Sequence, residues 1–305
     1  MKITIKKSLI VMVMAIALLL SMFVSVCLTA DADTAPASIK WGDGDTVPPE
    51  GGWATIIHQA GISNKSSADY AMSASKAWEF SVPAYENNAY RMTIAAAKGY
   101  ANIGTLPDLT SIPSENLALS FWVYAEDEIT FHTSFYIQIG FGGDGGYIFT
   151  PAEGAFAKNA GGSSVLKKGW NHFYVGMNSA LADSTYGTSY YSGGTGIKAY
   201  CPDIETESNT GKYFYLDFYR FAVAENTDSA KMYIDDIKFV NTAKLDEVVQ
   251  TVKRADALEA VANDGIYGNI ALGADIALTQ NLILTNDCAV TTGEYSVNYG
   301  EYKIL

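Results

Sequence analysis

The sequence predicts an all-β protein, in which a β-sandwich is followed by one amphipathic helix and a short β tail. Between about residues 76 and 240, short runs alternate apolar with polar residues, as in Ala77–Val82 and Tyr90–Ile94. Because successive side chains of a strand point to opposite sides, this alternation indicates strands with one buried face. Clusters of Asp, Gly, Pro and Asn separate the runs, as turns require. No convincing helical period interrupts them, and many short strands of this kind are typical of a β-sandwich.

The first 32 residues have the pattern of a secretory signal peptide. A start with three lysines precedes an apolar run that ends near Val26. Ala30 and Ala32 then provide small residues at the positions that a signal peptidase reads. An uncleaved membrane anchor is the alternative, because the run is nearly long enough to span a bilayer. The cleavage-like site favours removal, so we expect a secreted, extracellular protein without stable membrane insertion.

The net charge argues against some classes of partner, and the cysteine content limits the number of disulfides. The chain has 33 acidic and 20 basic residues and a formal net charge of −13. Such a surface disfavours nucleic acid and anionic lipid, which both need clusters of Lys and Arg. Only Cys201 and Cys288 remain once the signal peptide is removed. Two cysteines are too few for a disulfide framework, and they either form one bridge or stay free.

Four predicted strands pair an apolar face with an unusual second face. In the runs 117–124, 135–141, 170–177 and 213–219, the second face is made of Trp, Tyr, His, Gln and Asp instead of Lys, Glu, Thr and Ser. Aromatic rings can stack on the C–H face of a sugar while polar neighbours bind its hydroxyls. The alternative is that other parts of the chain cover this face. The carbohydrate-binding candidates on these strands are Trp122, Tyr124, Tyr136, Gln138, His172 and Tyr174.

Two segments between the predicted strands have distinctive compositions. Residues 178–212 have no period and are dense in Tyr, Ser, Thr and Gly, which is the composition of adaptable binding loops. This loop adds Tyr190 and Tyr191 to the carbohydrate-binding candidates, with a mobile insertion as the alternative. The glycine-rich run Phe141–Tyr147 lacks the Lys-Ser/Thr of a phosphate loop and is interpreted as a hairpin or wide turn.

The last sixty residues differ in character. Apolar residues recur at helical spacing over residues 243–264, which predicts one linking helix that Asn263-Asp264-Gly265 ends. Residues 265–305 then form short strand-like runs. The phrase from Leu272 to Leu284, LGADIALTQNLIL, resembles the opening coils of secreted right-handed β-helix proteins. A tail of this length is too short for an independent solenoid, which needs several stacked repeats.

The order of motifs in the main domain, residues 33–241, resembles a known family. The strand Ser120–Tyr124, the entry Lys168-Gly-Trp-Asn171 and the closing Met232–Val240 are similar to jelly-roll, galactose-binding-like carbohydrate-binding modules of secreted bacterial glycan-active proteins. The resemblance implies a jelly roll that binds polysaccharide without catalysis. It also implies a structural calcium held by Asp235 or Asp236 in the last strand.

The closing motif contains a local conflict. Ile234 and Ile237 would face opposite sides of a regular strand. Either a β-bulge intervenes or both sides of the strand are covered.

Enzyme motifs are missing from the sequence. It contains neither HExxH nor GxSxG. Glu79, Glu126, Asp127 and Glu128 are candidate acids by charge alone, and the run 126–128 has the pattern of a solvated turn. We therefore expect a non-catalytic module. A fragment of a polysaccharide lyase or glycoside hydrolase, and a structural cell-surface protein without a glycan ligand, are the alternatives.

Overall fold

The computed structural model describes residues 34–42, 54–57, 64–73, 75–85, 91–97, 109–141, 146–149, 151, 153–176, 188–191, 213–225 and 227–305. The chain divides into two compact units, Met1–Pro36 and Ala37–Leu305. The predicted signal peptide lies outside the described residues. Among the helices that are described, none is long and apolar enough to cross a membrane. The second unit holds everything discussed below.

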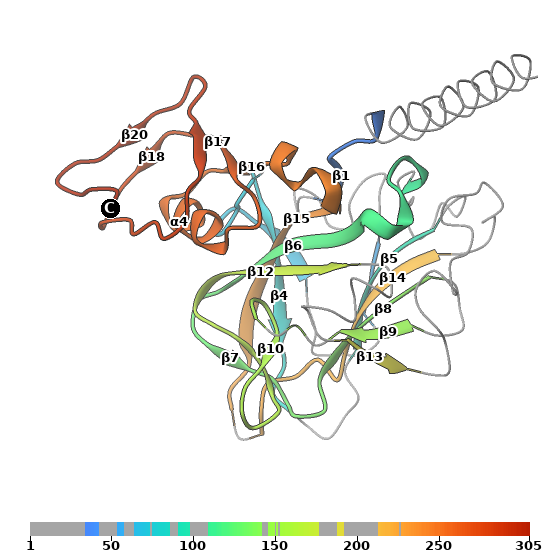
Figure 1. Cartoon of the computed structure of the whole chain (residues 1–305). Helices are drawn as coiled ribbons and strands as arrows, with labels where there is room; N and C mark the ends of the chain where they lie inside the picture. The colour runs from blue at the N-terminus through green and yellow to red at the C-terminus, as the bar shows by residue number, and fades with distance from the viewer. Residues whose placement is uncertain are drawn as a thin grey trace, which may run out of the picture. The chain divides into compact units, whose positions relative to one another are not determined.

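One antiparallel six-stranded sheet, here called sheet A, has the order β12-β6-β15-β4-β3, and β1 also pairs with β15 (Figure 1). Strands β4, β6, β12 and β15 match predicted runs closely, whereas β1 and β3 lie before the region in which alternation was predicted. The last strand, β15, is the longest and pairs with three neighbours. The strands span Ser38–Gly42 (β1), Asn64–Ser67 (β3), Ala77–Val82 (β4), Leu117–Ala125 (β6), Gly169–Gly176 (β12) and Ala230–Asn241 (β15).

A second antiparallel six-stranded sheet, sheet B, has the order β13-β9-β8-β14-β5-β2. The hairpin predicted at Phe141–Tyr147 is confirmed, because β8 and β9 pair antiparallel on either side of it. The strands span Ala54–Ile57 (β2), Arg91–Ala97 (β5), Tyr136–Phe141 (β8), Gly146–Phe149 (β9), Thr188–Tyr191 (β13) and Tyr213–Tyr219 (β14).

The apolar faces of the two sheets form one core. Phe121 and Phe173 of sheet A belong to the same buried cluster as Ile137, Leu216 and Phe218 of sheet B. The chain passes from one sheet to the other between β4 and β5, between β5 and β6 and again before β15, as in a jelly roll. The predicted jelly-roll β-sandwich is therefore confirmed.

Smaller elements complete the sandwich. A three-stranded sheet has the order β10-β11-β7. Two short 3-10 helices precede β6. Their bounds are Leu109–Ser111 (η1), Ser114–Asn116 (η2), Ile129–Thr130 (β7), Ala157–Lys158 (β10) and Ser164–Leu166 (β11).

The predicted irregularity in β15 is a β-bulge. The pairing of β15 with β6 shifts register between Asp235 and Lys238. Asp236 has φ +52°, in the left-handed region that Asp tolerates better than most residues. The bulge lets Ile234 and Ile237 both reach the core, where each is at most 1% exposed.

The helix predicted over residues 243–264 is wrong in its first half. Thr242–Glu247 forms a 3-10 helix (η3), Val249–Val252 is a strand (β16), and only Ala255–Asp264 is α-helical (α4). Val249, Thr251 and Val252 are β-branched residues that suit a strand, and pairing with β17 selects that conformation. The predicted end is confirmed, because Gly265 caps α4 at φ 72°.

The tail is built of parallel strands. Val249 of β16 lies beside Asn269 of β17 (Asn269–Leu272), and Asn269 lies beside Ala289 of β19 (Ala289–Thr291). A second parallel pair joins β18 (Ile276–Ala277) to β20 (Val297–Asn298). Each turn of this chain takes roughly 20 residues, as in known solenoid repeats. The tail, residues 248–305, is therefore a short solenoid attached to the sandwich.

Candidate functional site

The predicted aromatic faces lie on two different sheets. Strands β6 and β12 carry Trp122, Tyr124, His172 and Tyr174 in sheet A, whereas β8 carries Tyr136 and Gln138 in sheet B. The loop candidates Tyr190 and Tyr191 form part of β13, the strand that pairs with β9 at one edge of sheet B. The segment 178–212 thus contains a strand, and its side chains lie outside the described residues. The eight candidates do not form one surface.

The tail covers the outer face of sheet A. Trp122 is 1% exposed, His172 5% and Tyr174 6%. Trp122 lies in one buried cluster with Leu258 and Val261 of α4. The prediction that these three side chains present an open sugar platform is therefore wrong. Their amphipathic rings instead suit a face that other parts of the same chain cover.

A series of hydrogen bonds joins sheet A to the tail. His172 Nε2 lies 2.8 Å from Ser120 Oγ, and His172 Nδ1 lies 2.8 Å from Asp264 Oδ2 at the end of α4. Tyr267 donates its hydroxyl to Ser120 Oγ at 2.7 Å. The order Ser-His-Asp is that of a catalytic triad. Ser120 is 0% exposed, however, so in this state no substrate can reach its hydroxyl.

Tyr124 lies at the margin of the covered region. It is half-buried, and its ring stacks on Tyr70 with centroids 3.9 Å apart. Burial, with Tyr70 second, raises the pKa of Tyr124 to about 12. Arg254 lies 5.2 Å from the centroid of Tyr70. Protein groups thus already occupy these ring faces.

The remaining candidates Tyr136 and Gln138 lie on the outer face of sheet B, where Tyr136 is half-buried but Gln138 is 6% exposed, as little as Tyr174. Met92, Ile94, Ile137, Leu216 and Phe218 point into the core. Their neighbours along β5, β8 and β14 therefore point away from it. We call the described outward side chains the sheet B face; they are Arg91, Thr93, Tyr136, Gln138, Tyr215, Asp217 and Tyr219.

Two stacked tyrosines and a guanidinium form one part of the sheet B face. Tyr136 and Tyr219 stand opposite each other on β8 and β14, and their rings stack at 4.9 Å with 6° between the planes. The guanidinium carbon of Arg91 lies 4.5 Å from the centroid of Tyr219. All three side chains are half-buried, so parts of them reach the surface.

A buried carboxylate anchors the other part. Asp217 is 0% exposed and accepts hydrogen bonds from the Arg91 guanidinium and the Thr93 hydroxyl. Although partial burial acts the other way, Asp217 raises the pKa of Arg91. Gln138 Nε2 donates to the Tyr215 hydroxyl at 3.4 Å. Thr93, Gln138, Tyr215 and Asp217 are each at most 7% exposed, so the partly exposed side chains of the face are Arg91, Tyr136 and Tyr219. Its ion pair between Arg91 and Asp217 is neutral overall.

The sequence carried a signal for Arg91 and Thr93 that the predicted site did not use. Both occupy polar positions of the alternating run Tyr90–Ile94. The pairing of β5 with β14 brings them beside Tyr219 and Asp217. Alternation within one strand shows which side chains share a face, but it does not show which strand lies next to it.

Three of the four acids considered for catalysis have side-chain partners, and the fourth, Glu128, is exposed. Glu79 pairs with Lys65 at 3.2 Å and with Lys231 at 3.1 Å. Glu126 accepts the hydroxyl of Tyr233 at 2.8 Å. Asp127 pairs with Lys168 at the exposed turn. On the described parts of β5, β8 and β14, Asp217 is the single carboxylate of the sheet B face.

The two acids predicted to hold calcium are engaged by protein donors. Asp235 accepts backbone N–H groups of Met72 at 2.7 Å and Ser73 at 3.1 Å. Asp236 Oδ2 accepts Lys238 Nζ at 2.9 Å and Gln250 Nε2 at 2.8 Å. Calcium needs six to eight oxygen ligands. Among the described residues no three His, Cys, Asp or Glu side chains gather to hold a metal ion, and calcium stays a prediction.

Asp235 is expected to make stability depend on pH. Burial and the neighbouring Asp236 raise the pKa of Asp235 to about 8, although backbone N–H donors act against them. An unfolded Asp titrates near ~4. The folded state binds more protons between these values, so the free energy of unfolding falls as pH rises through this window. We expect a loss of about 2 kcal/mol between pH 6 and pH 8 in urea denaturation.

The control for this dependence is Asp235→Asn, because an amide does not titrate in this range. The variant should be less stable, since its Nδ2 replaces an acceptor of backbone N–H groups, but it should respond much less to pH. An unchanged pH dependence in the variant would assign the effect to other groups.

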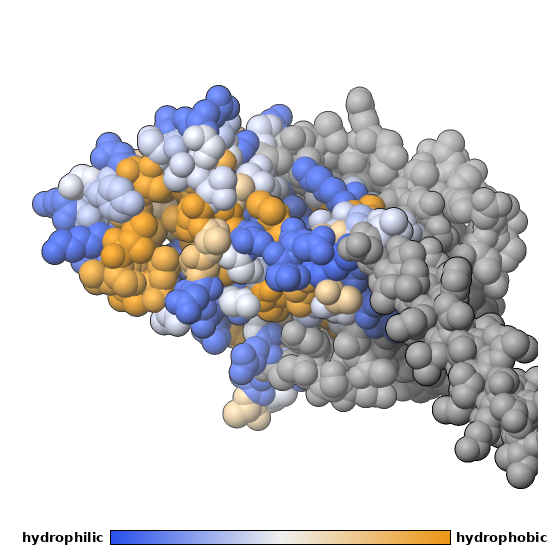
Figure 2. Space-filling view, turned by 45° about the horizontal axis from the view of Figure 1, so that its top comes forward, coloured by the Kyte–Doolittle hydropathy of each residue, from blue (hydrophilic) through white to orange (hydrophobic). Residues whose placement is uncertain are grey.

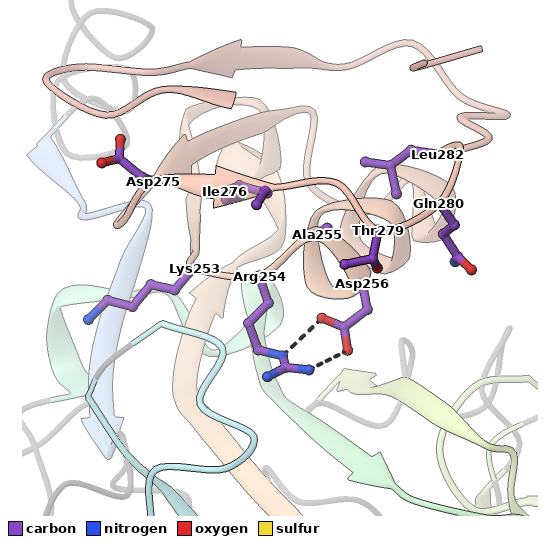
Figure 3. A pocket seen from close by; sticks show the side chains of 10 residues that line it. Lys253, Arg254, Ala255, Asp256, Asp275, Ile276, Thr279, Gln280 and Leu282 are labelled. Atoms are coloured by element: carbon purple, nitrogen blue, oxygen red, sulfur yellow. Dashed lines mark hydrogen bonds and ion pairs between the residues drawn. The ribbon is translucent and has the colours of Figure 1, made fainter. Parts of the chain in front are cut away.

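A pocket of about 360 Å³ lies within the tail (Figure 3). The turn from β16 into α4 forms one side, and the segment around β18 forms the other. Arg254 and Asp256 form an ion pair at its wall, with Arg254 Nε 2.9 Å from Asp256 Oδ1. None of the predicted site residues lines this pocket, so it is separate from both sheet faces.

Comparisons of the sequence with known proteins find no match. No family model matches the chain, and no curated protein matches it. Several solved structures match about two thirds of this chain with low identity and low TM-scores. A family 11 carbohydrate-binding module of the cellulase Lic26A-Cel5E of Clostridium thermocellum is 16% identical with a TM-score of 0.38, over 67% of this chain and 94% of that one.

Two further structures illustrate the range. The CBM22-1 xylan-binding domain of Paenibacillus barcinonensis Xyn10C is 10% identical with a TM-score of 0.32, over 68% of this chain and 97% of that one. An endo-β-1,4-glucuronan lyase of Trichoderma reesei is 11% identical with a TM-score of 0.36, over 66% and 94%. Carbohydrate-binding modules and an enzyme thus share this kind of similarity, and the function must be argued from the chain's own residues.

Proposed function

We propose that the protein binds polysaccharide without catalysis through the sheet B face. One observation carries the proposal: Tyr136, Tyr219 and Arg91 form a stacked, partly exposed cluster beside the buried Asp217. Rings of this kind bind the C–H face of a sugar, and fixed polar groups bind its hydroxyls. The candidates Tyr190 and Tyr191 belong to the same sheet and extend this proposal toward its β13 edge.

The cluster is rigid before any ligand arrives. Arg91 is held by Asp217 on one side and by the Tyr219 ring on the other. A preformed site avoids the entropy of ordering side chains on binding. Because the ion pair is neutral overall, the face favours an uncharged glycan over a polyanion.

The proposed place of action is outside the cell. The support is the sequence pattern of the first 32 residues, with its lysines, apolar run and small residues. Mass spectrometry of the exported chain tests this directly. A mature N-terminus near residue 33 is expected, and an intact N-terminus on a membrane-bound chain would contradict it.

Tyr219→Ala is expected to weaken glycan binding about 5- to 30-fold, because stacking and burial of one tyrosine contribute roughly 1–2 kcal/mol. Affinity gel electrophoresis against soluble plant, fungal and bacterial polysaccharides measures the effect. Tyr124→Ala is the matched control, since Tyr124 is a half-buried tyrosine of sheet A whose ring faces are occupied. The proposal fails if no polysaccharide binds, or if both variants lose binding equally.

The alternative that the protein is an enzyme is tested with the same polysaccharides. Release of reducing ends or of unsaturated products would show a hydrolase or a lyase. The single carboxylate of the described sheet B face argues against the paired acids of a glycosidase. Calcium remains a prediction for the chain, and repeating the binding assay with a chelator tests it.

A further inference from the structure

Three buried polar side chains meet where the tail joins the sandwich. Lys238 and Asp236 belong to β15, and Gln250 belongs to β16, the first strand of the tail. Figure 2 shows hydrophobic residues gathered over the part of the surface formed by the tail, whereas this contact inside the molecule is polar. Gln250 is 0% exposed, Lys238 5% and Asp236 6%. We call these three side chains the junction cluster.

Each member of the junction cluster contacts the other two. Lys238 Nζ donates to Gln250 Oε1 at 2.7 Å and to Asp236 Oδ2 at 2.9 Å. Gln250 Nε2 donates to the same Oδ2 at 2.8 Å. An amine therefore lies against a carboxamide carbonyl, and one carboxylate oxygen bridges the amine to the amide nitrogen. These are the parts that an amide exchange needs: a nucleophile, an electrophile and a proton carrier.

The surroundings of the junction cluster exclude water. The centroid of the Tyr267 ring lies 4.7 Å from Lys238 Nζ, and Met72 Sδ lies 3.6 Å from Gln250 Nε2. Water would otherwise compete with the amine for the carbonyl carbon. Transfer of a proton from the ammonium to the carboxylate leaves no net charge in this dry site, so the neutral amine becomes accessible without an isolated buried charge.

We propose that Lys238 and Gln250 become joined by an isopeptide bond between Nζ and Cδ, with loss of ammonia. The bond links β15 to β16 and so ties the sandwich covalently to the tail. A buried ion pair is costly to desolvate, and the reaction replaces the pair of Lys238 and Asp236 by neutral groups. The proposal does not depend on glycan binding.

Asp236 carries the protons in this reaction. It first takes one proton from the Lys238 ammonium, which frees the lone pair of Nζ. A partial rotation of the Gln250 amide turns Cδ toward Nζ, the new C–N bond forms, and the π electrons of the carbonyl move to Oε1. Asp236 then protonates Nε2, the old C–N bond breaks as the carbonyl reforms, and ammonia leaves. The second proton of Nζ returns to Asp236, which ends as a neutral carboxylic acid.

Proximity supplies the rate of the reaction. Nζ contacts the oxygen bonded to the carbon that it attacks, and the fold holds both groups in place. An intramolecular step between groups held in contact avoids the entropy cost of a bimolecular encounter. The bond therefore forms in the folded chain without an added enzyme or oxidant.

Mass spectrometry of the intact, denatured protein tests the proposal. Folded wild-type protein should be lighter than its mature sequence by one ammonia molecule. Trypsin should release Met232–Lys244 joined to Leu245–Lys253, because an acylated Lys238 is no longer cleaved. A folded protein that keeps the full mass after prolonged incubation would overturn the proposal. A loss of ammonia that maps to other residues would overturn it too.

Lys238→Arg and Lys168→Arg form a matched pair of variants. Arg keeps the positive charge, but its guanidinium does not give up a proton and cannot attack the amide. Lys238→Arg should therefore keep its full mass, whereas Lys168→Arg, altered at an exposed lysine, should lose ammonia as wild type does. Loss of ammonia in Lys238→Arg would contradict the assignment of the nucleophile.

Asp236→Asn removes the proton carrier. The fraction of cross-linked chains, followed against time after synthesis, should rise about 100-fold more slowly than in wild type, the usual effect of losing a general acid and base. A rate equal to that of wild type would contradict the role given to Asp236.

Discussion

Replacing Lys238 by Met is expected to lower the free energy of unfolding by about 3–5 kcal/mol, because it leaves a buried carboxylate without its counter-ion. The side chain of Lys238 is 6% exposed and that of Asp236 9%. Although burial acts in the opposite direction, Lys238 lowers the pKa of Asp236 and keeps it ionised. Lys238 also lies 4.7 Å from the centroid of Tyr267 and donates to Gln250 Oε1 at 2.7 Å. Urea denaturation measures the loss.

The same network joins the sandwich to the tail, so the variant should also loosen the tail. Limited proteolysis within residues 248–305 should become faster. Adding Asp236→Asn should recover much of the stability, since Asn tolerates φ +52° and needs no counter-ion. Lys168→Met is the control, because Lys168 and Asp127 are exposed and their pairing contributes little. A loss in Lys168→Met equal to that in Lys238→Met would refute the role of burial.

Strand positions could be predicted from the sequence because alternation is a local property. Ala77–Val82 and Tyr213–Tyr219 are strands over the very ranges that the pattern indicates. Parity at Ile234 and Ile237 also indicated either a bulge or cover on both sides of the strand, and the register shift shows the bulge. These features depend on side-chain direction within one strand, and the order of residues fixes that direction.

Which strands share a sheet, and what covers them, could not be predicted in the same way. Parity places Trp122 and Tyr136 on second faces, but it does not say that β6 and β8 belong to different sheets. Nor does it show that the tail lies on β6 and β12. Val249–Val252 was predicted as helix for the same reason, because its partner strand lies elsewhere in the sequence. Long-range pairing decided each of these points.

Trp122→Ala is expected to lower the free energy of unfolding by about 3–5 kcal/mol, the usual cost of removing a buried Trp. The indole is 1% exposed and stacks on His172 at 4.3 Å with 6° between the planes. It also packs against Met72 and the α4 residues of the tail. Removing it opens a cavity between sandwich and tail. Thermal and urea denaturation measure the loss.

Trp122→Phe separates packing from hydrogen bonding. The indole Nε1 of Trp122 has no described hydrogen-bond partner, so Phe removes an unpaired polar group while it keeps most of the ring. We therefore expect Trp122→Phe to be much closer to wild type than Trp122→Ala. A loss as large as that of Trp122→Ala would show that the indole shape, and not ring burial, holds the tail.

The two tryptophan variants also separate the two sheet faces. If glycan binding belongs to the sheet B face, Trp122→Ala should retain wild-type affinity at temperatures where it is folded, whereas Tyr219→Ala should not. The opposite pattern would mean that the tail leaves sheet A to admit the ligand, exposing Trp122 and His172 to it. Stacked rings thus occur both in sheet A, where the tail covers them, and in the sheet B face, where we propose that they bind glycan.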